Sequence, residues 1–402
     1  MTGPPDRSSP VPAGPAGTPT VLVWGTYDLG KPRTRILLRG LREVGVPVVE
    51  CHAGVWDAVE DKSQLRGTGR RLRLLVRWLS RYPRLVLRYL RAPRHDVVLV
   101  GYPGFLDLLV LRPWARLRRV PVVWDVFVPL YDALVEDREL LGPRHPAARL
   151  LLRAEGAAAR RADRVLLDTR AQAERFRSVH GLASDRVGTV PVGVEPEAFP
   201  LLGDGASPPG RAAPSAPTAL FYGQMIPLHG VGTILEAAAS PAGQGIRWRV
   251  IGRGQEVEKV ERALREGRSP TLEWVPWVPY DRLHEEIAGA DVCLGIFGTT
   301  AKAARVIPNK VFQVLAVGKP LVTRDGPGIR ELLREGPGIR LIPPGDAGAL
   351  VAAVTELAAE RPPLAAERLD RLRSSILPAA VGRQLRGELE EVLAAEGQRA
   401  GR

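Results

Sequence analysis

The segment FYGQMIPLHGVGTILEAA at residues 221–238 decides the fold, because a strand, a glycine loop and a helix follow one another in it. The apolar run from Ala219 to Tyr222 predicts a buried strand, and the periodicity of Val231 to Ala239 predicts a helix. Gly223 and Gly230 lie between them, where missing side chains let backbone N–H groups approach an anion. The segment therefore predicts a strand–loop–helix unit with an anion site in its loop. The alternative is that both are ordinary turn glycines.

The same alternation extends in both directions from this unit. Further strands are predicted at 20–26, 46–50, 96–100, 120–124, 164–167, 187–190, 248–251, 272–275, 292–297, 320–323 and 339–342. Strands separated by helices favour right-handed crossovers and parallel sheets, so we expect an α/β protein with two Rossmann-like, doubly wound domains facing across a cleft. The predicted parts are a disordered tail at 1–19, an N-terminal domain at 20–199, a Gly/Pro-rich linker at 200–217, a C-terminal domain at 218–378, and a helix and tail at 379–402 that is free to return to the N-terminal domain.

Charge and cysteine content limit the partners and the compartment. The chain has 57 Lys and Arg against 44 Asp and Glu, a formal net charge of +13, which indicates a nucleic acid, an acidic membrane surface or a phosphorylated substrate as partner. Cys51 and Cys293 have no metal-ligand spacing, which argues against a zinc site or disulfide framework. No run approaches about 18 apolar residues, and the tail has no signal-peptide core. We expect a cytoplasmic protein.

Five motifs occur in an order that resembles the family 4 (group 1) retaining glycosyltransferases of the GT-B fold, and the resemblance covers about 21–392. They are VPVGVEPEAFP at 190–200, FYGQMIPLHGVGTILEAA at 221–238, VIGRGQEVEKV at 250–260, GADVCLGIFG at 289–298 and IPNKVFQVLAVGKPLVT at 307–323. The resemblance implies transfer of a sugar from a nucleoside diphosphate sugar to an acceptor hydroxyl with retention of configuration. The implied acceptor is a glycan, a lipid-linked sugar or a small molecule, with cell-envelope polysaccharide as the setting.

The C-terminal half carries the residues that this resemblance assigns to the donor. Arg253, between two glycines, and Lys310, in the first turn of a predicted helix, are the expected catalytic cations at the diphosphate. The alternative for Arg253 is an ordinary surface arginine. The donor-binding residues expected are Gly223, Gln224, His229, Gly252, Arg253, Gly298, Thr299, Arg305, Asn309, Lys310 and Gln313.

Four of these residues depart from the family pattern. Gln224 and His229 stand where most members have Arg and Lys, while Arg305 and Gln313 replace a pair of glutamates spaced eight apart. The Asn-Lys motif at 309–310 resembles an atypical subgroup in which the lysine takes over diphosphate binding. We therefore expect the cations to be redistributed around Lys310.

The N-terminal half offers the acceptor-side candidates. Asp125 ends a predicted strand and is expected to bind the acceptor hydroxyl or take its proton, or else to cap the next helix. Tyr131 follows it, and the loop containing Gly30 and Lys31 resembles the acceptor loop of the family, with a simple turn as the alternative. His145 is, like His229, a candidate for polarising a hydroxyl or phosphate.

A basic stretch at 66–94 contains ten arginines and no acidic residue. The arginines recur every three or four residues along a predicted helix kinked at Pro83, opposite an apolar stripe that includes Leu75, Val76 and Leu79. Such a helix fits an anionic membrane surface, which would place the protein on the inner face of the cytoplasmic membrane. A helix packed on its own domain is the equal alternative.

No Asp-x-Asp motif is present, so we expect no metal and no cofactor beyond the donor co-substrate. Two other interpretations stay open: a nucleotide-sugar epimerase, which would need acid–base groups in the cleft, and a non-catalytic GT-B scaffold that binds a membrane surface. A nucleic-acid partner is not expected, because charge is the only feature that favours it.

Overall fold

The computed structural model describes residues 17–56, 68–201, 216–360 and 366–400. Two six-stranded sheets, parallel in every pairing, confirm the predicted α/β class. The N-terminal sheet has the order β2-β1-β3-β4-β5-β6. Its strands are β1 (Val21–Gly25), β2 (Val48–His52), β3 (Val97–Val100), β4 (Val122–Asp125), β5 (Arg164–Leu167) and β6 (Val187–Thr189). The central strands are buried throughout, because helices cover both faces of the sheet.

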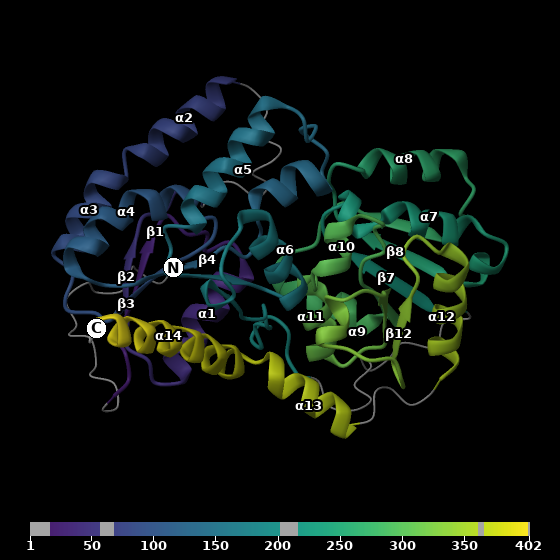
Figure 1. The fold of residues 1–402 in the computed structure, drawn as a ribbon. Helices are drawn as coiled ribbons and strands as arrows, with labels where there is room; N and C mark the ends of the chain where they lie inside the picture. The colour runs from purple at the N-terminus through teal and green to yellow at the C-terminus, as the bar shows by residue number, and fades with distance from the viewer. Residues whose placement is uncertain (1–16, 57–67, 202–215, 361–365, 401–402) are drawn as a thin grey trace.

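Two layers of helices enclose the N-terminal sheet (Figure 1). On one face, α3 (Tyr82–Leu90), α4 (Phe105–Arg118), α5 (Pro146–Ala159) and α6 (Arg170–His180) share one apolar cluster with the strands. On the other face, α1 (Pro32–Glu43) packs against α14 (Pro378–Ala400). Their backbones cross closely, since a Cβ on Gly382 would lie 2.1 Å from the Gly40 carbonyl oxygen. The C-terminal helix thus belongs to the core of the N-terminal domain.

The C-terminal sheet has the order β12-β11-β10-β7-β8-β9. Its strands are β7 (Thr218–Tyr222), β8 (Arg247–Ile251), β9 (Leu272–Val275), β10 (Val292–Leu294), β11 (Leu321–Arg324) and β12 (Ile339–Ile342). One face packs on α7 (Val231–Ala239), α8 (Val257–Glu266) and α12 (Ala347–Ala359). The other packs on α9 (Leu283–Gly289), α11 (Asn309–Val317) and α13 (Ala366–Ile376).

Two predicted elements differ from the structure. The strand expected at 292–297 ends at Leu294, because the N–H of Ile296 donates to Thr323 Oγ1 and that of Phe297 donates to the His229 carbonyl oxygen. The basic stretch forms two helices, α2 (Thr68–Leu79) and α3, because the first helix ends before Pro83 instead of continuing through a kink at that residue. Residues 1–16 of the predicted tail, residues 202–215 of the predicted linker and Arg66 lie outside the described residues.

Candidate functional site

The carboxyl ends of the two sheets face each other. After β4, a π-helical turn η2 (Asp132–Asp137) leads to Arg138, whose guanidinium donates to Gln224 Oε1 at 3.3 Å. Gln255, after β8, donates to the Arg138 carbonyl oxygen at 3.0 Å. Ligands of open α/β sheets bind at the carboxyl ends of the strands, so this interface contains the candidate site.

The glycines after β7 and β8 allow two loops to cross. A Cβ on Gly252 would lie 2.0 Å from the Gly223 carbonyl oxygen, and one on Gly254 would lie 2.6 Å from the Met225 nitrogen. The amides of Gly223 and Gly252 donate to the carbonyl oxygens of Ile251 and Val275. These two amides therefore serve neighbouring strands, and the glycines bring the two backbones into contact; their donor-binding role stays a prediction.

Lys310 lies in the first turn of α11, with its side chain buried against β7. Its Nζ is 3.7 Å from the centroid of the Phe221 ring, and a Cβ on Gly223 would lie 3.5 Å from that nitrogen. Within the described residues, Nζ has no hydrogen-bond partner. Desolvation lowers the pKa of Lys310 well below its usual range. An amine held in this way lacks a counter-charge.

His229 lies on the other side of Gly223, where its Cε1 would be 3.4 Å from a Cβ at that position. Its Nδ1 is hydrogen-bonded to the Gln224 carbonyl oxygen. Burial, and next the charge of Lys310, hold the pKa of His229 well below its usual range. The side chains of Lys310 and His229, each of which would be positively charged beside a bound anion, thus both lie next to Gly223.

Lys302 and Arg305, on the short helix α10 (Ala301–Arg305), instead bind acidic residues of η2. Lys302 Nζ is 3.7 Å from Asp137 Oδ2, and both side chains are buried. The Arg305 guanidinium is 2.8 Å from Glu136 Oε2 and 3.5 Å from Asp132 Oδ2. The structure thus places the predicted donor ligand Arg305 in an interdomain ion-pair cluster.

Two further predicted donor ligands also have protein partners. The Arg253 guanidinium lies over Trp274, 5.9 Å from the ring centroid. Gln313, one turn after Lys310, accepts a hydrogen bond from the Tyr222 hydroxyl at 2.9 Å. Either side chain would have to change partner to reach a donor, so their roles stay predictions.

The loop after β10 brings the remaining predicted donor residues to the same edge of the sheet. Gly298 is buried, since a Cβ there would lie 2.4 Å from the Leu228 carbonyl oxygen. Thr299 is exposed, and Asn309 is the half-buried first residue of α11. The loop is held by Arg324, the last residue of β11, which donates to the Gly298 carbonyl oxygen at 2.5 Å.

Asp125 lies in a closed ion pair at the end of β4. The Arg33 guanidinium is 2.6 Å from its carboxylate, and the two side chains are at most 1% exposed. Arg33 also donates to the Val190 carbonyl oxygen at 2.6 Å. The carboxylate caps no described helix, and it is available to an acceptor only where Arg33 releases it.

The other acceptor-side candidates lie on separate loops. Gly30 is exposed and donates its N–H to Asp28 Oδ1 at 2.9 Å, while Lys31 is the half-buried residue before α1. Tyr131 is half-buried directly before η2. His145 is exposed and caps α5, accepting the N–H of Ala147 at 3.1 Å. A structural cap therefore accounts for His145.

Sequence reasoning missed Lys302, Arg138 and Arg324. A usable signal was the scarcity of lysine, because only six of the 57 basic residues are lysines. In such a chain Lys302 and Lys310, eight residues apart, are both conspicuous, and both are buried in the structure. Arginine is too common here for Arg138 or Arg324 to be recognised in the same way.

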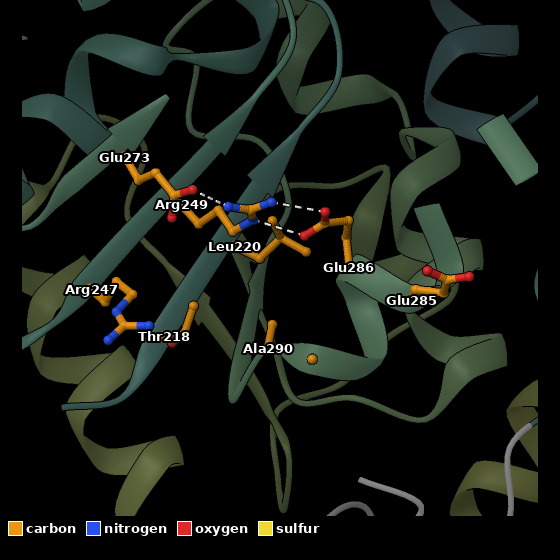
Figure 2. Close-up of a pocket in the computed structure, with 9 residues that line it drawn as sticks. Thr218, Leu220, Arg247, Arg249, Glu273, Glu285, Glu286 and Ala290 are labelled. Carbon is orange, nitrogen blue, oxygen red and sulfur yellow. Dashed lines mark hydrogen bonds and ion pairs between the residues drawn. The ribbon is translucent and has the colours of Figure 1, made fainter. Parts of the chain in front are cut away.

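A cavity of about 280 Å³ lies at the opposite, amino end of the C-terminal sheet (Figure 2). Arg249 crosses it and pairs with Glu273 and Glu286, so its charged wall is already neutralised. This cavity is separate from the interface between the domains. The described residues contain no cluster of three potential metal ligands and no helix long and apolar enough to cross a membrane.

Two facing Rossmann-like domains, with cations at the carboxyl ends of the C-terminal sheet, define a protein of the GT-B class. Comparison with known families identifies each half. Residues 15–193 match the "Glycosyl transferase 4-like domain" and residues 216–360 match "Glycosyl transferases group 1". The C-terminal half thus matches a group 1 glycosyltransferase domain and the N-terminal half a glycosyltransferase 4-like domain, in the order that the motifs predicted.

Individual known proteins are similar to this chain in part of its sequence or in its fold. The "Amylovoran biosynthesis glycosyltransferase AmsK" of Erwinia amylovora is 28% identical over 182 residues, and the match spans 44% of this chain and 43% of that protein, less than half of either. Anabaena Alr3699/HepE in complex with UDP and glucose has a TM-score of 0.59 at 14% identity, over 92% of this chain and 99% of that one. The lipopolysaccharide outer core galactosyltransferase WaaB has a TM-score of 0.57 at 14% identity, over 92% and 98%. Identities this low show a common fold.

Proposed function

We propose that the protein transfers a sugar from a nucleoside diphosphate sugar to an acceptor hydroxyl, with retention of configuration. The observation that carries the proposal is Lys310, a buried amine that has no hydrogen-bond partner among the described residues and lies beside His229 and Gly223. A diphosphate at Gly223 would supply the missing counter-charge. Because the leaving diphosphate gains negative charge as the glycosidic bond breaks, fixed cations there stabilise the transition state more than the ground state.

The positions of the side chains support the remaining proposed roles. Arg253 would join the diphosphate by leaving the face of Trp274, and Gln313, one turn from Lys310, would hydrogen-bond the ribose hydroxyls. The acceptor approaches from the loop of Gly30 and Lys31 and from Tyr131. A leaving-phosphate oxygen accepts the proton of the acceptor, so neither a carboxylate nucleophile nor a metal takes part.

The proposed acceptor is a glycan or lipid-linked sugar of the cell envelope, and the proposed location is the cytoplasm. The names of one relative and one structural neighbour, an amylovoran biosynthesis glycosyltransferase and a lipopolysaccharide outer core galactosyltransferase, support this acceptor.

Thermal-shift screening of the full chain against nucleotide sugars tests the donor proposal. Wild type is expected to be stabilised by one donor, the Lys310→Ala variant to lose that shift, and an Arg330→Ala control on the exposed surface to keep it. Slow sugar release from the same donor, insensitive to a chelator, supports a transferase. Reversible epimer formation, or no turnover with any donor, would overturn the assignment.

A further inference from the structure

Helix α2 presents an apolar stripe to solvent. Leu75, Val76 and Leu79 are 43%, 59% and 50% exposed, whereas the opposite side of the helix faces the protein. On that inner side Trp78 donates its indole N–H to Thr26 Oγ1 at 2.8 Å. Leu75, Val76 and Leu79 therefore point away from the domain, while Trp78 joins the same helix to it.

Helix α3 continues this surface with the same mixture of side chains. Tyr82, Leu85 and Tyr89 are buried, and Leu87 and Leu90 point outward at 46% and 41% exposure. Exposed arginines surround these leucines on the two helices and the turn after them: Arg73, Arg77, Arg84, Arg88, Arg91 and Arg94. Figure 1 shows α2 and α3 along one margin of the N-terminal domain, away from the C-terminal domain.

The neighbouring end of α4 carries similar residues. Arg118, the last residue of α4, joins α4 to the end of α3 by donating to the carbonyl oxygens of Tyr89 and Ala92 at 2.7 and 3.0 Å. Beside it, Leu117 is 72% exposed and Arg116 is exposed. The described surface thus combines aliphatic side chains with guanidinium groups over three helices.

The geometry points to an anionic lipid bilayer as the partner of this surface, which we call the α2–α3 face. Guanidinium groups bind lipid phosphates, and exposed leucines beside them enter the boundary of the acyl chains. A nucleic acid would use the arginines and leave the leucines in water. A second copy of the chain would oppose two arginine-rich faces, and 66–94 contains no acidic residue to pair them. This inference does not depend on the donor proposal.

Cosedimentation of the full chain with vesicles at about 0.15 M salt tests the inference. Wild type is expected to bind phosphatidylcholine–phosphatidylglycerol vesicles and to leave pure phosphatidylcholine vesicles unbound. The triple change Arg73→Gln, Arg84→Gln and Arg91→Gln should weaken partitioning on the order of a hundredfold, at about fivefold per arginine. The triple change Leu75→Ser, Val76→Ser and Leu79→Ser should weaken it at least about tenfold.

A matched control lies on α8 of the other domain, where Arg262, Leu264 and Arg265 are exposed. The triple change Arg262→Gln, Leu264→Ser and Arg265→Gln should bind vesicles like wild type, and all variants should unfold within a few degrees of one another. Three results would overturn the inference: no binding to anionic vesicles, full binding by the serine triple, or self-association that the serine triple abolishes. Tighter binding to single-stranded RNA than to vesicles would also reject a bilayer.

Discussion

Replacing Lys310 with methionine should stabilise the protein and abolish donor binding at the same time. The buried amine has no hydrogen-bond partner within the described residues, and such a group costs about 1–3 kcal/mol of folding free energy. Methionine keeps the length of the side chain and its contact with Phe221 but removes the polar atom. Because 1 kcal/mol shifts the Tm of a domain of this size by about 2–4 °C, a rise of several degrees is expected.

The same substitution should change the pH dependence of stability in a defined direction. Burial lowers the pKa of Lys310, so the folded state holds a neutral amine while the unfolded state stays protonated up to about pH 10.4. Between those two pKa values the unfolded state binds one more proton, and stability rises with pH by about 1.4 kcal/mol per unit. The stability gained by Lys310→Met should therefore shrink as the pH rises from the lowered pKa toward the unfolded value of about 10.4.

Denaturant unfolding of both proteins at several pH values measures this difference, and calorimetry with the donor found by screening measures binding. Burial also lowers the pKa of Lys302, but this lysine is present in both proteins, so its contribution to the pH dependence cancels in the comparison. A variant that is less stable than wild type at pH 7, or a stability difference that does not vary with pH, would show that Lys310 is not a neutral, unpaired amine. A stabilised variant that binds donor normally would instead reject its role at the diphosphate.

Three further outcomes follow from the same contacts. Donor binding should take up protons at a pH above the lowered pKa of Lys310, because the diphosphate raises that pKa; titration in buffers of different ionisation enthalpy measures this uptake, and its absence would contradict the charge argument. Arg305→Ala should cost about 1.5–3 kcal/mol and increase hydrogen exchange in η2, whereas the exposed Arg330→Ala should stay within about 0.5 kcal/mol in denaturant unfolding. Asp125→Asn should destabilise the protein by about 3–5 kcal/mol by leaving Arg33 unpaired, and lost turnover at unchanged stability would favour the acceptor role instead.

The fold could be predicted from the sequence because its signals are local. Apolar runs separated by amphipathic segments identify buried parallel strands, and Gly/Pro-rich residues at 200–217 separate the two series. The strand expected to reach Phe297 stops at Leu294 for a non-local reason, the hydrogen bonds to Thr323 and His229. Such bonds join segments that sequence periodicity treats independently.

The site was predicted less completely, because its contacts are long-range. Gly223 and Gly252 lie directly after strands, as predicted. Their amides donate hydrogen bonds to neighbouring strands, and the absence of a Cβ lets the two loops cross. Arg305 was assigned to the donor, and its partners Glu136 and Asp132 lie more than 160 residues away in the other domain. A motif shows that a cation is present, but not which anion it already binds.

The distribution of counter-charges also explains why the familiar donor cations can be replaced. Lys302 and Arg305 face Asp137, Asp132 and Glu136, so their charges are largely compensated when the domains are in contact. Lys310 and His229 have no acidic partner within the described ion pairs, and each is driven toward its neutral form. A diphosphate that binds here would therefore be stabilised most by Lys310 and His229. The acidic residues of η2 would keep Lys302 and Arg305 from repelling these two groups. Since the charge of Lys302 contributes to the lowered pKa of His229, neutralising the η2 acids should lower that pKa further, which couples donor affinity to contact between the domains.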